Sequence, residues 1–334
     1  MSRPSPDAWH YRAGGACRTI VPMQEEAIRV EGLGKAYGDL EAVSGLTFSV
    51  AAGEVFCLLG PNGAGKTTTT EILEGYRARS AGEVRVLGHD PEHGERALRE
   101  RVGIVLQEAA AQAELTVAEV LTMYGRYYPR HRPVDELVGL VGLEGRENDR
   151  VKLLSGGQKR RLDLALGLVG DPDLLFLDEP TTGFDPSARR QAWTTIKDLC
   201  ALGKTVFLTT HFMDEAQALA DRVAVMANGR LVAMGTPAEI GGRDTAPTEI
   251  AFTLPAGIAV ADLPDLGAGT TVSEPAPGRV LVVAPHGLRT SHAITGWALE
   301  RGHELRGFEV TQPSLEDVYL RLTAENETAL EATR

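Results

Sequence analysis

The octapeptide GPNGAGKT at residues 60–67 constrains this chain more than any other feature of its sequence. The apolar run EVFCLL precedes it, and the helix-like segment TTTEILEGY follows it. In the pattern GxxxxGK[ST], the glycines let the backbone curl, so that successive N–H groups and the positive end of the next helix face phosphate oxygens. The sequence therefore predicts a phosphate-binding loop between a strand and a helix. These flanking elements disfavour the alternative, an ordinary glycine-rich turn with a surface lysine.

The individual residues of this loop have predicted tasks. Lys66 is predicted to reach the β- and γ-phosphates of a nucleotide as a catalytic residue, and Thr67 to bind Mg²⁺. A phosphate loop alone does not separate kinases, GTPases and ATPases, so the class of enzyme depends on motifs elsewhere. The residues of the loop predicted to contact the nucleotide are Gly60, Pro61, Asn62, Gly63, Ala64, Gly65, Lys66, Thr67 and Thr68.

The charge balance of the chain limits its partners. Lys and Arg total 34 against 46 Asp and Glu, which gives a formal net charge of −12. Such a surface repels phosphate backbones at long range, so no nucleic acid is expected as a partner.

The sequence has no run of about 18 apolar residues and no apolar signal-peptide core, so we do not expect the chain itself to span a membrane. Its three cysteines lack metal-ligand spacing, which favours a reduced, intracellular location.

Short apolar runs alternate with helix-like stretches between residues 27 and 240, which predicts a mostly parallel α/β sheet covered on both faces. These runs are AIRV, EVFCLLG, RVGIVL, LLFLD, TVFLTT and RVAVMA. LTVAEVLTMYGRYY and VDELVGLVGL have helical spacing and predict an all-helical insertion. Beyond a Gly/Pro/Thr-rich segment after Gly235, EIAFTL, RVLVVAP and ELRGFEV predict strands, and SHAITGWALER and SLEDVYLRLTAE predict helices.

These patterns divide the chain into segments. We expect a disordered tail at 1–25 and a nucleotide-binding α/β domain at 26–240 that contains a helical subdomain at about 108–165. A small C-terminal α/β domain is expected at 241–324 and a second tail at 325–334.

The segment LLFLDEP at residues 174–180 is an apolar strand that ends in two carboxylates. Both carboxylates are expected at the carboxyl edge of the sheet, where ligands of such sheets bind. Asp178 is predicted to contact Mg²⁺ indirectly, through water or through one of the metal's own ligands, and Glu179 is predicted to polarise the attacking water. An acidic turn before Pro180 is the alternative, which the presence of GPNGAGKT disfavours.

The segment LSGGQKRRLDLALGLV begins at Leu154 and combines a cap with a helix. Ser155 and Gln158 fit the capping-box pattern S-x-x-Q, which is a purely structural explanation for those two residues. Gly156 and Gly157 stay unexplained, because glycine in a first turn weakens a helix by up to about 1 kcal/mol each. Close backbone approach would explain them, so this helix tip is predicted to be a second anion site.

GPNGAGKT, LSGGQ and LLFLDEP in this order resemble the ATP-binding subunits of ATP-binding-cassette (ABC) transporters. LSGGQ is the specific part, because other phosphate-loop families lack it. The resemblance covers about residues 27–240. It implies a phosphate-loop NTPase fold with a mostly parallel core, an N-terminal antiparallel β part and the helical insertion, followed here by the C-terminal domain.

The resemblance also implies roles for four single residues. Tyr37 would stack on adenine, and a half-buried strand aromatic is the alternative for it. Gln107 would bind the metal and link it to the helical insertion as a catalytic residue. His211 would contact the γ-phosphate, again as a catalytic residue. Asp185 would lie in the loop that meets the partner subunit, where Phe184 replaces the more usual leucine.

The partners and cofactors follow from the same resemblance. ATP and Mg²⁺ would lie between GPNGAGKT of one subunit and the Ser155–Gln158 tip of a second, in a homodimer or heterodimer. A separate transmembrane permease subunit would carry the substrate, which implies an ATPase in the cytoplasm, peripheral on the inner face of the cell membrane. The alternative, a soluble ABC ATPase that acts on the ribosome or on nucleic acid, is disfavoured by one copy of each motif, the absence of sustained heptads and the negative net charge.

The segment PSLEDVYLRLT at residues 313–323 resembles the C-terminal signature of an exporter branch. That branch includes drug-resistance ATPases of the daunorubicin type and related polysaccharide and nodulation exporters, which implies export of a drug, lipid or polysaccharide-like substrate. A second interpretation is an amphipathic helix that packs on its own domain through Leu315, Val318, Tyr319 and Leu322. We also hypothesise that this domain helps two subunits to dimerise.

Met123, Tyr124, Tyr127 and Tyr128 recur at helical spacing in the insertion. A stripe of core residues explains this pattern. A groove that receives a short helix from the membrane partner, as the family implies, also explains it.

Overall fold

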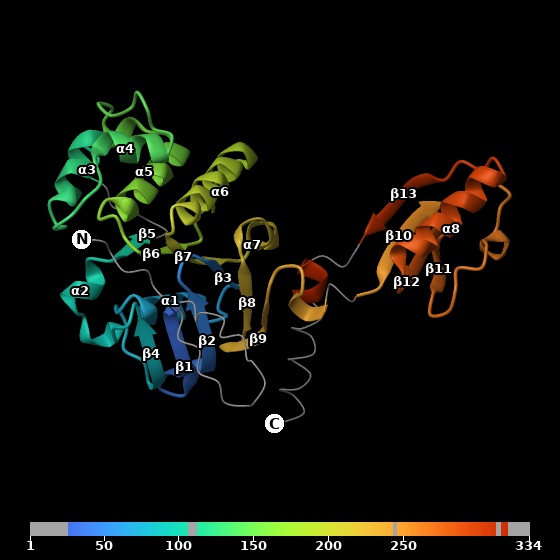
Figure 1. Ribbon diagram of the computed structural model, residues 1–334, viewed down its shortest axis with the longest axis horizontal. Helices are drawn as coiled ribbons and strands as arrows, with labels where there is room; N and C mark the ends of the chain where they lie inside the picture. Colours follow the sequence, from blue (N-terminus) through green and yellow to red (C-terminus); the bar gives the residue numbers. More distant parts are fainter. Residues whose placement is uncertain (1–25, 106–111, 243–245, 312–314, 320–334) are drawn as a thin grey trace, which may run out of the picture.

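The computed structural model describes residues 26–105, 112–242, 246–311 and 315–319 (Figure 1). The tail expected at 1–25, Gln107 and the chain beyond Tyr319 lie outside these ranges. Within them, no helix is long and apolar enough to cross a bilayer.

A six-stranded sheet forms the centre of the larger part of the molecule, in the order β5-β6-β7-β3-β8-β9. Its neighbours pair in parallel except β8 and β9, which are antiparallel. Five of the six strands predicted from apolar runs are present in this sheet, and their two-sided burial explains why they read as continuous apolar segments. The run AIRV lies instead in β1 (Glu26–Tyr37) of a separate antiparallel sheet, and β9 was not predicted. The six strands are β3 (Val55–Leu59), β5 (Val102–Val105), β6 (Leu174–Asp178), β7 (Thr205–Thr210), β8 (Arg222–Ala227) and β9 (Arg230–Gly235).

An antiparallel sheet in the order β2-β1-β4 covers one face of this centre and confirms the expected N-terminal β part. Phe48, Phe56 and Phe207 stack at the interface, with centroid distances of 5.3 Å between the first two and 5.7 Å between the last two. Helix α1 (Lys66–Leu73) also contributes to this core. The strands are β1 (Glu26–Tyr37), β2 (Leu40–Ala51) and β4 (Ala81–Val86), followed by η1 (Pro91–His93) and α2 (Arg96–Arg99).

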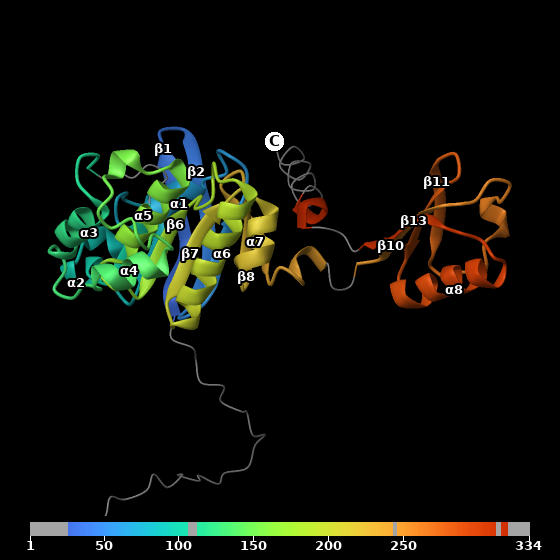
Figure 2. The ribbon, with the colours of Figure 1, turned by 90° about the horizontal axis from the view of Figure 1, so that it is seen from above.

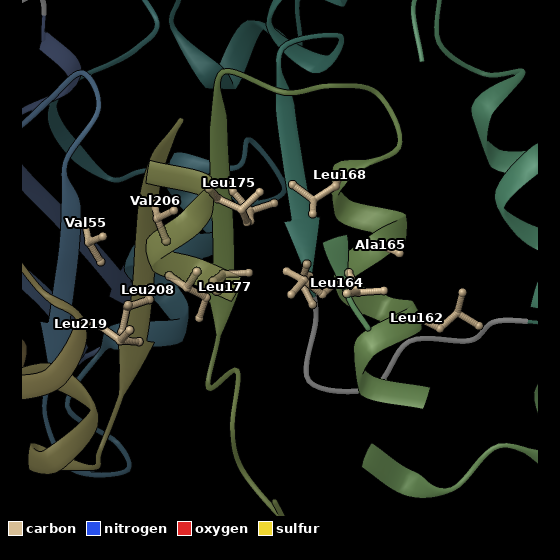
Figure 3. Packing of buried hydrophobic residues seen from close by; sticks show 14 of the residues in the cluster. Val55, Leu162, Leu164, Ala165, Leu168, Leu175, Leu177, Val206, Leu208 and Leu219 are labelled. Carbon is tan, nitrogen blue, oxygen red and sulfur yellow. The ribbon is translucent and has the colours of Figure 1, made fainter. Parts of the chain in front are cut away.

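Helices cover the opposite face of the six-stranded sheet. Figure 3 shows how apolar residues of the sheet, such as Leu177, face those of α5, such as Leu164 and Leu168, within one core. Between β5 and β6 the described chain is helical, as expected. A capping box at Thr116 starts the first of these helices. The helices of this face are α3 (Val117–Gly125), α4 (Val134–Leu140), η2 (Val151–Leu153), α5 (Gly156–Leu168), α6 (Pro186–Ala201) and α7 (Met213–Leu219).

The C-terminal part has its own antiparallel sheet in the order β11-β12-β10-β13, with α8 packed on one face (Figure 2). Three of its strands and α8 match expected elements. Strand β11 was not expected, because its sequence TVSEPA is polar and every residue in it is exposed. The elements are η3 (Ile240–Gly242), β10 (Thr248–Thr253), η4 (Val260–Asp262), β11 (Thr271–Ala276), β12 (Arg279–Ala284), α8 (Gly287–Glu300) and β13 (Arg306–Thr311).

Residues 315–319 form a short helical turn that returns to the larger part of the molecule (Figure 1). Leu315 is buried in the same core as α5 and the six-stranded sheet, together with Ile240, and Tyr319 packs against that core. The expectation that these two residues pack on the C-terminal domain is therefore wrong. Amphipathic spacing predicts an apolar face correctly but does not tell which surface covers it, and Leu322 lies outside the described residues.

Candidate nucleotide-binding and catalytic site

Three adjacent strands bring the predicted motifs to one edge of the six-stranded sheet. Strand β7 lies between β3 and β6, with Leu59 of β3 opposite Thr210 and Asp178 of β6 opposite Thr209. Because these strands are parallel, their carboxyl ends meet at the same edge. The loop 60–67, the Asp178–Glu179 pair and His211 are therefore neighbours.

The fold itself requires two glycines of the phosphate loop. A Cβ atom on Gly60 would lie 2.4 Å from the Met226 carbonyl oxygen, and one on Gly65 would lie 2.6 Å from the Ala42 carbonyl oxygen. Gly65 also has a φ of 98° and caps the N-terminus of α1, a conformation that favours glycine. The loop therefore turns tightly into the helix, so that its N–H groups can face an anion.

Lys66 lies at the base of this loop with only 6% of its surface exposed. Its Nζ donates to the carbonyl oxygens of Gly60 at 2.7 Å and Pro61 at 3.0 Å. Burial lowers the pKa of Lys66, while the carboxylates of Glu179 and Asp178 oppose that shift. An ammonium group in this position suits the predicted task of Lys66, which is to compensate the negative charge of a phosphate chain.

A cavity of about 400 Å³ opens beside the loop. Six predicted residues of the loop and helix and both carboxylates line it, which is the arrangement expected for a triphosphate held against the tip of α1. The lining residues are Ala42, Asn62, Gly63, Gly65, Lys66, Thr67, Thr68, Asp178 and Glu179.

Hydrogen bonds fix the two carboxylates in different orientations. Asp178 Oδ1 accepts a hydrogen bond from Thr209 Oγ1, which holds it at the end of its strand. Glu179 has a φ of 46°, which is uncommon for a non-glycine residue, and this backbone turn aims its side chain away from the strand direction. Glu179 Oε1 lies 2.9 Å from His211 Nδ1, and Glu179 Oε2 accepts from Thr182 Oγ1 at 3.2 Å.

The residues present fit a magnesium ion that arrives with a nucleotide. No group of three or more His, Cys, Asp or Glu side chains suited to a metal occurs in the described ranges. Mg²⁺ is usually held by one or two carboxylates together with substrate phosphates and waters. Thr67 and Asp178 both line the cavity and offer such oxygens. Gln107, the third predicted ligand, lies outside the described residues.

The tip of α5 has the capping box that the sequence predicts. Ser155 Oγ accepts from the Gln158 N–H at 3.3 Å, and Gln158 Oε1 accepts from the Ser155 N–H at 2.9 Å. A Cβ atom on Gly156 or Gly157 would meet nothing within 4 Å. The local fold of this helix therefore does not require glycine at either position. Within the described ranges, no residue of the tip lines the cavity beside Lys66.

Tyr37 and Asp185 lie at the surface, and each has a local explanation. Tyr37 is 40% exposed, with Lys35 Nζ 5.1 Å and the Arg77 guanidinium 5.4 Å from the centroid of its ring. It can therefore present a flat face at the surface. Asp185 caps α6 by accepting from Ser187 N–H at 2.8 Å and Ala188 N–H at 2.9 Å, which also lowers its pKa.

Two polar residues near the site were not singled out from the sequence. Thr209 could have been predicted from the sequence. It lies two residues before His211 on an extended segment, so both side chains are expected on the same face of that segment. Glu215 on α7 is buried and accepts from Thr181 Oγ1 at 2.8 Å and Trp193 Nε1 at 3.2 Å. Burial raises the pKa of Glu215. It joins the segment after Glu179 to the segment after His211, a contact that no local spacing predicts.

A phosphate loop with neighbouring carboxylates defines a phosphate-loop nucleotide-binding enzyme, and the helical subdomain that carries the Ser155 tip sets this one apart from other phosphate-loop enzymes. That combination defines the ABC class of ATPases. Residues 43–182 match the family described as ABC transporter, and residues 248–314 match the C-terminal domain of ABC transporter domain-containing protein-like sequences. The chain belongs to the ABC transporter family as an ATP-binding, ATP-hydrolysing subunit.

Relatives with similar chains agree with this assignment. Nod factor export ATP-binding protein I of Paraburkholderia xenovorans (strain LB400) is 41% identical over 307 residues, which cover 90% of this chain and 98% of the relative. The protein of the same name from Rhizobium meliloti (strain 1021) is 44% identical, covering 70% and 72% of the two chains. Among solved structures, cbiO1 from Clostridium perfringens, part of the ABC transporter complex cbiONQ, has a TM-score of 0.58 at 31% identity and covers 64% and 90%.

Proposed function

We propose that this chain is the ATPase subunit of an ABC export system whose substrate binds a separate membrane subunit. The observation that carries the proposal is the 41% identity to a Nod factor export ATP-binding protein over nearly the whole of both chains, including the C-terminal domain. A drug, lipid or polysaccharide-like substrate agrees with the PSLEDVYLRLT segment, and the name of the relatives favours an oligosaccharide linked to lipid.

We further propose that two such subunits enclose ATP between them, with Mg²⁺ bound by Thr67, Asp178 and Gln107. Ser155 and Gly156 are exposed, and the open space around both glycines leaves room for a phosphate chain brought by a partner. The N–H groups at the tip of α5 and the loop at α1 are both anion sites, so a triphosphate can hold them together. Loss of the γ-phosphate would remove the contact with the tip and let the subunits separate.

A groove beside α3 supports the proposal that a short helix of the membrane subunit docks on this chain. The cavity there measures about 370 Å³ and is lined by Tyr124 and Tyr128 of the predicted stripe, together with Glu74 and Tyr76. Tyr124 and Tyr128 also pack against the main core, whereas Tyr127 is 75% exposed. Tyr124 and Tyr128 therefore contact both the core and the groove, and within the described ranges Tyr127 contacts neither of them.

The position of Glu74 in this groove predicts that the stability of the protein depends on pH. Burial raises the pKa of Glu74 to about 8, with Asp178 and Glu71 as further causes. Between the ordinary carboxyl pKa and this value the folded protein binds more protons than the unfolded chain, so stability falls as pH rises towards 8. We expect E74Q to be more stable than the wild type by about 1–2 kcal/mol at pH 8.5 and nearly equal to it at pH 5. Thermal unfolding at both pH values checks this, with the exposed-site variant E83Q as control.

Transport in vesicles tests the exporter proposal. The chain would be expressed with the product of a neighbouring reading frame that has about six spanning helices, and inverted membrane vesicles would be prepared. We expect ATP-dependent uptake of a lipid-linked oligosaccharide into these vesicles and no uptake with K66A. ATP hydrolysis without uptake of this substrate, of free lipid or of a cationic drug would contradict export by this system.

A further inference from the structure

Arg160 connects helix α5 to the backbone that carries the catalytic carboxylate. Its Nη2 donates to the carbonyl oxygens of Asp178 at 3.0 Å and Glu179 at 3.4 Å. Its Nε donates to the carbonyl oxygen of Pro180 at 3.3 Å. One guanidinium group therefore donates hydrogen bonds to three successive main-chain carbonyl oxygens where β6 ends.

The backbone of this turn is strained at Glu179, the residue proposed to activate water. Glu179 has a φ of 46°, and strained backbone of this kind persists only where surrounding contacts determine it. On one side, the Glu179 N–H lies 3.1 Å from the Thr209 carbonyl oxygen and 3.2 Å from Thr209 Oγ1. On the other side, Arg160 holds the carbonyl groups. The direction of the Glu179 side chain depends on both.

The chemistry of the guanidinium suits this task. Arginine presents several N–H donors in a rigid planar fork, whereas lysine offers a compact ammonium group on a flexible stem. Arg160 is partly buried, and burial lowers its pKa, although arginine stays charged at neutral pH. The carbonyl oxygens therefore accept charge-assisted hydrogen bonds, which are stronger than neutral ones.

We propose that Arg160 is a positioning residue for Glu179, which it holds in the strained backbone conformation required for activation of water. The proposal rests on the function proposed above, because it assigns Glu179 as the base. Arg160 lies five residues after Ser155, so one rigid helix carries both. A shift of the Ser155 tip, when it meets the nucleotide of the opposite subunit, therefore reaches Glu179 of its own subunit through Arg160.

Steady-state ATP hydrolysis by the purified full-length chain tests this role. We expect R160A to lower kcat by about 30–100-fold with KM and ATP affinity changed less than about threefold. R160K should recover part of the loss, because it keeps the charge but not the fork. The matched control is R161A, since Arg161 donates instead to the Gly142 carbonyl oxygen and to Gln191. It should stay within about threefold of the wild type.

A double-mutant cycle separates positioning from a general structural role. In single-turnover assays, R160A should reduce the residual activity of E179Q by less than about threefold, because the group it positions is already lost. An equal loss in both backgrounds, a parallel loss of ATP affinity, or wild-type turnover by R160A would overturn the proposal. If R160A does not fold, R160K and R160Q undergo the same cycle. A failure of E179Q to dimerise with ATP would instead contradict the proposed two-subunit site. The double-mutant cycle would still test Arg160, because it measures ATP hydrolysis and not dimerisation.

Discussion

Replacing Glu179 with glutamine is expected to lower ATP turnover by about 10²–10³-fold while ATP affinity stays within about threefold of the wild type. Glutamine has the size of glutamate and keeps an oxygen that can face His211 Nδ1, now 2.9 Å from Glu179 Oε1. It cannot accept a proton from water at neutral pH, so binding survives and the chemical step does not. Phosphate release and nucleotide binding, measured separately, distinguish these two effects.

The same substitution should trap the two subunits together. With hydrolysis blocked, the triphosphate continues to join the loop at Lys66 to the Ser155 tip, so E179Q with ATP and Mg²⁺ should elute as a dimer in size-exclusion chromatography. The wild type should return to monomer as ATP is consumed. E83Q, which alters an exposed carboxylate of β4, should behave like the wild type. Wild-type turnover by E179Q would remove Glu179 from the role of general base.

The site could be predicted from the sequence wherever local pattern and sheet geometry coincide. The runs VFCLL, LLFLD and TVFLTT are buried on both faces, so they read as parallel strands, and each is followed directly by chemistry-bearing residues. Ligands bind at the carboxyl edge of such sheets, so the motifs predicted Lys66 and Asp178 at one ligand site, and the family resemblance added His211. The strand order, with β7 between β3 and β6, required the structure.

Contacts between distant segments could not be predicted in this way. Arg160 follows LSGGQ in the chain, but its partners at 178–180 depend on how α5 packs across the sheet. Leu315 has amphipathic spacing, yet it joins the core of the ATP-binding part rather than its own domain. Strand β11 has no apolar alternation, and it exists because β12 offers an edge to pair with. Each depends on tertiary packing that local propensity does not encode.

Replacing Lys66 with alanine should abolish ATP hydrolysis, with a loss of at least about 10³-fold, and should weaken ATP binding as well. Lys66 is the buried cation at the loop, and its Nζ also satisfies the Gly60 and Pro61 carbonyl oxygens. Its removal therefore takes away both charge compensation for the phosphates and the contact that shapes the loop. K197A, at an exposed position of α6, is the control and should hydrolyse ATP normally. Hydrolysis by K66A close to the wild-type rate would contradict the assignment of this cavity.

A mixing experiment with K66A then shows whether each site is built from two chains. G156D is the second variant, because a Cβ at Gly156 meets nothing within 4 Å, so the chain should fold while the new carboxylate repels a phosphate. Each variant alone should be inactive. In a mixed dimer, both lesions fall in the site formed by the K66A loop and the G156D tip, and the other site is intact. Equal mixing makes half of the dimers mixed, so about a quarter of wild-type activity should return. Activity no higher than that of the separate variants would place each catalytic site within a single chain.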